Sequence, residues 1–137
     1  LDYGISLNIG IFKGLDIKID NMFYFDKGKT TLSLEETSFF MVTTSLGLQV
    51  SLKIAKLFNP YFGGGGCFTY YHENDFIYKT YGTAFGYQIE FGDYIYLSKN
   101  VWIDLNFRYI DIKARPYDET INLGGLRSNI GFCLGLR

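Results

Sequence analysis

The sequence is poor in cysteine, histidine and net charge, and each shortage excludes a class of protein. The 137 residues include two cysteines and one histidine, and the formal net charge is −1. Two cysteines outside any CxxC or Cys/His cluster exclude a disulfide scaffold and a cysteine-ligated zinc site. A net charge this close to zero leaves no basic surface for nucleic acid, so no such partner is expected. The length is that of a single domain over residues 1–137.

Long apolar runs and nucleotide-binding motifs are also missing. No apolar run approaches the ~20 residues that a transmembrane helix requires. Residues 1–10 lack the basic and apolar regions of a signal peptide, so we expect a mature or trimmed chain if the protein is exported. Four glycines at 63–66 are followed by Cys67 and Phe68, whereas a phosphate-binding loop needs lysine and then serine or threonine. No cofactor is expected.

Aromatic residues, glycine and strict alternation are abundant. Aromatic residues make up 19% of the chain, and 16 glycines stand against two prolines. The core of a protein of this length cannot hold so many aromatic rings, so many of them must face something other than a protein interior. Apolar residues alternate with small or polar ones at period two, which predicts strands and no helix. The seven alternating segments are residues 3–11, 15–25, 40–52, 61–71, 81–95, 101–109 and 126–136.

The length and polarity of these segments predict a transmembrane barrel. They exceed the globular strand mode of about 5–6 residues and match the roughly 9–11 tilted residues that cross a bilayer. One face carries too much glycine and charge to form a core, and the other is too apolar to lie in water. Lipid outside and a small polar interior satisfy both faces. The alternative is a soluble barrel or sandwich, such as a lipocalin-like carrier, with its apolar face inward.

Three stretches carry a family resemblance: NPYFGGGGCF, FGYQIEFGDYIYLSKNVWIDLNFRYI and INLGGLRSNIGFCLGLR. They resemble the last four strands of small bacterial outer-membrane β-barrel proteins of the eight-stranded class (OmpA/OmpX-like barrels), over roughly residues 38–137. The resemblance implies a Gram-negative outer-membrane location and a final strand that ends in the periplasm. Members of the family usually end on an aromatic residue, whereas this chain ends on Arg137.

The connections between segments alternate between short and long. Short ones lie at 13–14, 53–59 and 98–100, and long polar ones at 26–37, 72–79 and 113–120. Outer-membrane barrels have short periplasmic turns and long outer loops. With the last strand ending in the periplasm, the first strand seen runs downward, and an even-stranded barrel needs one more strand before Leu1. We expect an all-β, antiparallel up-and-down barrel of eight strands, seven of them present in this chain. A strand from another copy or an odd-stranded barrel is the alternative.

Strand register predicts an ion pair inside the barrel. A three-residue turn at 98–100 places Glu90 directly opposite Arg108, both on the inward face. We expect a structural network of polar side chains there, because buried charges need partners. Proton or ion passage is the alternative, although so narrow a barrel leaves no aqueous channel. The other predicted members of the network are Gln88, Asp104, Asn106 and Arg127, and the residues predicted to plug the periplasmic end are Tyr94, Tyr96 and Trp102.

One cluster has metal-ligand or acid–base potential. His72, Glu73 and Asp75 fall in a predicted outer loop and are candidate interaction residues. No nucleophile and base in register are visible around His72, so a solvated loop is the simpler interpretation. We expect no metal site and no enzyme. Cys67 and Cys133 lie on strands that are not neighbours, and we expect two free thiols.

The expected function is that of an integral outer-membrane β-barrel protein with a closed interior and a structural or surface-interaction role, adhesin-like or antigen-like. The expected partners are the lipid bilayer, lipopolysaccharide, and extracellular or envelope proteins that contact the outer loops. One alternative is an outer-membrane lipid-modifying enzyme with His72 as its base. The other is the soluble lipocalin-like carrier.

Overall fold

A computed structural model describes residues 2–29, 36–52, 54, 57–74, 79–115 and 120–134, and all regular structure in them is β-strand. None of these residues belongs to a helix that is long and apolar enough to cross a membrane. The strands are β1 (Asp2–Phe12), β2 (Leu15–Lys29), β3 (Glu36–Ser51), β4 (Phe58–Asn74), β5 (Lys79–Tyr96), β6 (Val101–Ala114), β7 (Ile121–Asn122) and β8 (Gly125–Leu134).

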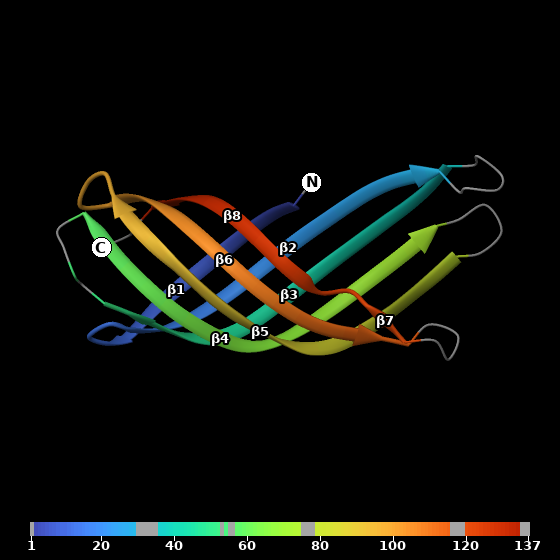
Figure 1. Cartoon of the computed structure of the whole chain (residues 1–137), viewed down its shortest axis with the longest axis horizontal. Coiled ribbons are helices and arrows are strands. Elements are labelled where there is room, and N and C mark those ends of the chain that lie inside the picture. The colour runs from blue at the N-terminus through green and yellow to red at the C-terminus, as the bar shows by residue number, and fades with distance from the viewer. Residues whose placement is uncertain are drawn as a thin grey trace.

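The strands form one antiparallel up-and-down sheet that is strongly twisted and curled (Figure 1). Each strand from β1 to β6 pairs with the next along the chain, and both β7 and β8 pair with β6. The seven alternating segments of the sequence therefore all form strands. The structure adds one short strand outside these segments, the two-residue β7, which pairs with β6 ahead of β8. A Cβ on Gly124, between β7 and β8, would collide with the Ile110 carbonyl oxygen.

The sheet is not closed within the described residues. Strands β1 and β8 are its two edges, and neither pairs with the other. Successive pairings are antiparallel throughout, so β1 and β8 run in the same direction. Two strands that run the same way cannot complete an antiparallel ladder by pairing with each other.

The two ends of the sheet differ, and we name them here. The turn end carries the short connections at Lys13 and Gly14 and at residues 97–100. The loop end, to the right in Figure 1, carries the distal ends of β2, β4 and β6. At the turn end Gly14 has φ +78°, and a Cβ there would lie 2.6 Å from the Ser51 carbonyl oxygen, so glycine is required at this turn.

Strands at the loop end run further than the alternation of the sequence predicts. The β2–β3 ladder continues to Lys29 opposite Glu36, and the β4–β5 ladder to Asn74 opposite Lys79. Much of the stretches 26–37 and 72–79, predicted as loops, is therefore strand. Backbone hydrogen bonds do not require an apolar side chain, so a ladder extends beyond the end of an apolar pattern.

The two faces of the sheet have opposite polarity. On β5, the outward Phe85 is 76% exposed, whereas the inward Glu90 is 3% exposed. The middle of the inside is charged and polar. Toward the loop end the inside is apolar, which the sequence reasoning did not predict; this inner apolar cluster comprises Met22, Met41, Cys67, Tyr71, Ala84, Ile110, Ile112 and Ala114.

Candidate functional site

Four buried charged side chains meet inside the curled sheet. They are Lys18 and Asp20 of β2, Glu90 of β5 and Arg108 of β6, each between 1% and 4% exposed. Lys18 Nζ lies 2.9 Å from Glu90 Oε2. Arg108 Nη2 lies 2.8 Å from Glu90 Oε2 and 3.1 Å from Asp20 Oδ2. Two cations and two anions balance, so no charge in this quartet is left without an opposite partner.

The quartet combines one pair that the sequence predicts with two residues that it did not single out. Glu90 lies directly opposite Arg108 in the β5–β6 ladder, as the short turn predicts. Lys18 and Asp20 come from the far side of the curl, and no local turn relates β2 to β5. The sequence does place charged residues on the inward face of residues 15–25, and the cost of burying those charges requires an oppositely charged partner inside the sheet.

Glycines leave the room that Lys18 needs. Strands β3 and β4 lie between β2 and β5, and their inward positions beside Lys18 are Gly47 and Gly65, paired with each other. The Lys18 side chain extends across them to reach Glu90. A Cβ on Gly63 would already lie 3.2 Å from Glu90 Oε1. Gly63 and Gly65, the inward residues of the glycine run, therefore leave space inside the sheet for the ion pairs.

Neutral polar groups surround the quartet. Asn106 Nδ2 donates to Glu90 Oε2 at 3.0 Å and to the Tyr61 hydroxyl at 2.7 Å. The Tyr61 hydroxyl donates to Asp104 Oδ1 at 2.7 Å, which links Asp104 to the network. Further donors to Asp20 are Ser6, Ser45 at 3.4 Å and Gln88 at 3.5 Å.

Arg127 lies on the inward face of β8, opposite Arg108 in the β6–β8 ladder. Its guanidinium carbon lies 5.7 Å from the centroid of the Tyr24 ring, a cation–π arrangement. Arg127 therefore extends the cationic side of the inside toward β2.

Aromatic side chains fill the inside at the turn end. Tyr94 is 4% exposed and stacks on Tyr61 at a centroid distance of 4.5 Å. Its hydroxyl accepts a hydrogen bond from Asn8 at 2.8 Å. Trp102 is half-buried and contacts Tyr94 edge-on at 6.3 Å and Tyr96 at 5.6 Å. All three residues predicted to plug this end thus belong to one ring cluster, to which Tyr61 must be added.

The candidate chemical cluster is not in a loop. His72 and Glu73 belong to β4, opposite Tyr81 and Thr80 of β5, so their loop prediction was wrong; Asp75 lies outside the described residues. Among the described residues no hydrogen bond joins His72 to a hydroxyl or carboxylate, and no group of three His, Cys, Asp or Glu could hold a metal. Cys67 and Cys133 are free thiols, as predicted.

A groove of about 550 Å³ lies between the two edge strands. Its walls come from β1 and β8, and the inward side chains of Asp20, Asp104 and Arg108 lie at its base. The groove therefore borders the polar inside of the sheet.

No protein-family model and no curated protein sequence matches the chain. The function is therefore inferred from the geometry. The arrangement that dominates that geometry is a set of paired, buried charges with an apolar outer surface.

Proposed function

We propose that the chain forms the wall of an integral β-barrel of the bacterial outer membrane, with a structural or surface-interaction role and no chemistry of its own. One observation carries this proposal: in the middle of the curled sheet the charged side chains lie inside and the apolar side chains lie outside. The reverse holds in a soluble barrel, whose inside is apolar.

The outer face is costly to leave in water. On β8 alone, Ile130 is 82% exposed, and Phe132 and Leu134 are each 69% exposed. Burial of one such side chain contributes about 1.5–3 kcal/mol. A lipid environment supplies that burial for every strand at once, and the strands of 10 to 18 residues are long enough to cross a bilayer. A lipocalin-like carrier is disfavoured, because ion pairs and aromatic rings occupy the space where its ligand would lie.

The same proposal includes closure of the ring by one further strand. Because β1 and β8 run in the same direction, a single strand antiparallel to both completes an up-and-down barrel with eight long strands. The groove between the edges is where it would lie. Such a strand needs apolar residues outward and small or polar residues inward, above Asp20, Asp104 and Arg108.

The proposed partners follow from this location. The bilayer contacts the apolar face, and lipopolysaccharide is the outer-leaflet lipid at the loop end. Extracellular or envelope proteins would contact the connections at that end. The quartet stabilises the wall and needs no ligand, because each of its charges already has a partner.

Refolding tests the proposal. We expect the urea-unfolded chain to fold only when detergent micelles or lipid vesicles are added, to float with the vesicles, and to be protected there from added protease. The folded form should also migrate differently from the boiled form on an SDS gel, because the long strand ladders and the buried ion pairs resist unfolding by the detergent. The control is the same chain kept in urea with vesicles. A chain that folds and stays monomeric in buffer without detergent would contradict membrane insertion.

A further inference from the structure

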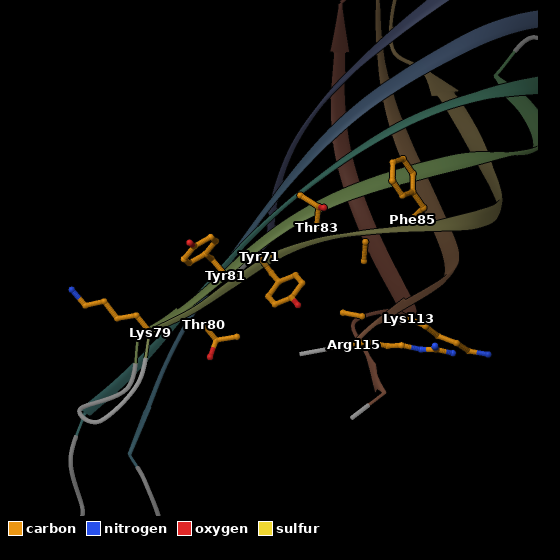
Figure 2. Close-up of a pocket in the computed structure, with 11 residues that line it drawn as sticks. Tyr71, Lys79, Thr80, Tyr81, Thr83, Phe85, Lys113 and Arg115 are labelled. Carbon is orange, nitrogen blue, oxygen red and sulfur yellow. The ribbon is translucent and has the colours of Figure 1, made fainter. Parts of the chain in front are cut away.

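Strands β5 and β6 separate before they reach the loop end. Strand β5 begins at Lys79, but its ladder with β6 begins only at Gly86 opposite Ile112. Beyond that point, among the described residues, β6 keeps a partner only on its other edge, where Lys113 lies opposite Asn122 of β7 in the register of the β6–β8 ladder. The result is a cleft of about 610 Å³ between residues 79–85 and 113–115, which we call the fork (Figure 2).

The inward side of the fork is closed by buried side chains. Tyr71 of β4 is 5% exposed and Ala84 and Ala114 are buried beside it. A Cβ on Gly82 would lie 2.7 Å from Tyr71 Cζ, so the ring packs directly against the β5 backbone. The floor is therefore continuous with the inner apolar cluster, and a ligand of the fork would lie on the outer side of the sheet.

The outer side of the fork is cationic. Lys79, Lys113 and Arg115 are exposed, and none of them forms an ion pair with a carboxylate of the described residues. Figure 2 shows Lys113 and Arg115 extended side by side in one direction, and Lys79 on the opposite side of the cleft. The nearest carboxylate on this face of β6 is that of Asp111, which lies opposite Tyr87 in the ladder. Two cations in parallel match the oxygens of one phosphate group.

Exposed rings lie on the same face, level with the cations and between them and the middle of the sheet. Phe85 is 76% exposed and lies level with Lys113, one outward position beyond the Tyr87–Asp111 pair; Tyr87 and Tyr109, nearer the middle, are 52% and 41% exposed. Moving from the loop end toward the middle of the sheet, the outer surface thus passes from positive charge to aromatic rings. This is the order of a lipid, with its headgroup first and its acyl chains below.

We propose that the fork binds a lipid whose headgroup carries a phosphomonoester, with the phosphate on Lys113 and Arg115 and the acyl chains over Phe85, Tyr87 and Tyr109. The backbone of residues 79–85 adds polar groups on the edge of β5 that faces no strand in the described part of the chain. This inference rests on the proposed membrane location. It adds to that location a defined lipid site.

Free phosphate fits these observations less well than a phosphorylated lipid. Exposed cations in water hold an anion weakly, because solvent and salt screen the attraction. The exposed rings offer nothing to an inorganic ion, whereas they add apolar contact to a lipid chain. The cations and the exposed rings together therefore favour a phosphorylated lipid over free phosphate or a lipid without phosphate.

Binding of a fluorescent short-chain phosphatidic acid to the folded chain in detergent micelles tests the site. The variant is Lys113→Gln with Arg115→Gln, and the matched control is Lys13→Gln with Lys99→Gln, which removes the same charge at the turn end. We expect the first pair to weaken binding by about tenfold or more, since each charge-assisted hydrogen bond contributes about a factor of ten. The control should bind as the parent does. Thermal unfolding of both variants checks that the sheet is intact.

Three results would overturn the site. The first is equal affinity of the fork variant, the control and the parent. The second is equal affinity for diacylglycerol, which lacks the phosphate, and the third is full displacement of the lipid by inorganic phosphate at a similar concentration. The assay does not require insertion into a bilayer, so its outcome is separate from that of the refolding test. If the chain enters vesicles and the lipid binds the parent, the fork variant and the control alike, the membrane proposal remains and the lipid site at the fork is excluded.

Discussion

Replacement of Gly65 by alanine is expected to destabilise the folded chain by about 3 kcal/mol or more, or to prevent folding altogether. A Cβ at this position would collide with the Leu46 carbonyl oxygen and the Gly47 Cα, and would lie 2.7 Å from the Leu46 carbonyl carbon. These are backbone atoms of the paired strand, so they cannot turn aside as a side chain would. Unfolding in urea from micelles, followed by the SDS gel shift, measures the loss.

Gly66→Ala is the matched control. It adds the same methyl group to the next residue of the same strand, on the outer face, where a Cβ would have no neighbour within 4 Å. We expect no loss of stability, or a slight gain because alanine reduces the freedom of the unfolded chain. Equal midpoints for the two variants would show that β3 and β4 do not approach each other as closely as described.

Loss of Arg108 is expected to have the second large effect. Arg108→Met should cost about 3–5 kcal/mol, because removal of one partner leaves an uncompensated charge in a buried site. The carboxylate most affected is that of Asp20, which forms its ion pair with Arg108. Glu90 keeps Lys18 at 2.9 Å. The measurement is again unfolding in urea.

A second substitution separates charge balance from packing. Adding Asp20→Asn to Arg108→Met removes one negative and one positive charge, and the Lys18–Glu90 pair remains neutral as a unit. We expect the double variant to recover most of the stability lost by the single one. If the double variant is less stable than Arg108→Met, or if Arg108→Met costs no more than the exposed Lys99→Gln, the quartet does not act as a balanced unit.

The strands and one ion pair were predictable because they depend on local pattern. Period-two alternation identifies a strand wherever one face differs from the other, and all seven segments form strands. The Glu90–Arg108 pair follows from a single short turn, which fixes the register of the two strands beside it. The free thiols followed from the same strand order.

What escaped prediction depends on the curl of the whole sheet. Lys18 reaches Glu90 across two intervening strands, and alternation says which face a residue takes but not which strand lies opposite across the inside. The fork arises because the β5–β6 ladder ends at Gly86 opposite Ile112 while both strands continue toward the loop end, which neither strand's pattern reveals. The short strand β7, ahead of the last predicted segment, depends on a pairing with β6 that is likewise non-local.

The contact between the outer face of β5 and lipid is the central claim, and spin labels measure it most directly. The background is a chain with Cys67→Ala and Cys133→Ala, inserted into vesicles. A nitroxide is attached to a single cysteine that replaces Phe85, Tyr87, Ile89 or Phe91. The water-exposed reference is Lys99→Cys. All four positions are outward and exposed, so the labels leave the quartet undisturbed. We predict collision with oxygen dissolved in the bilayer and protection from a water-soluble nickel reagent at all four, and the reverse at Lys99→Cys. Four labels as accessible to the nickel reagent as the reference would contradict a membrane-facing outer surface.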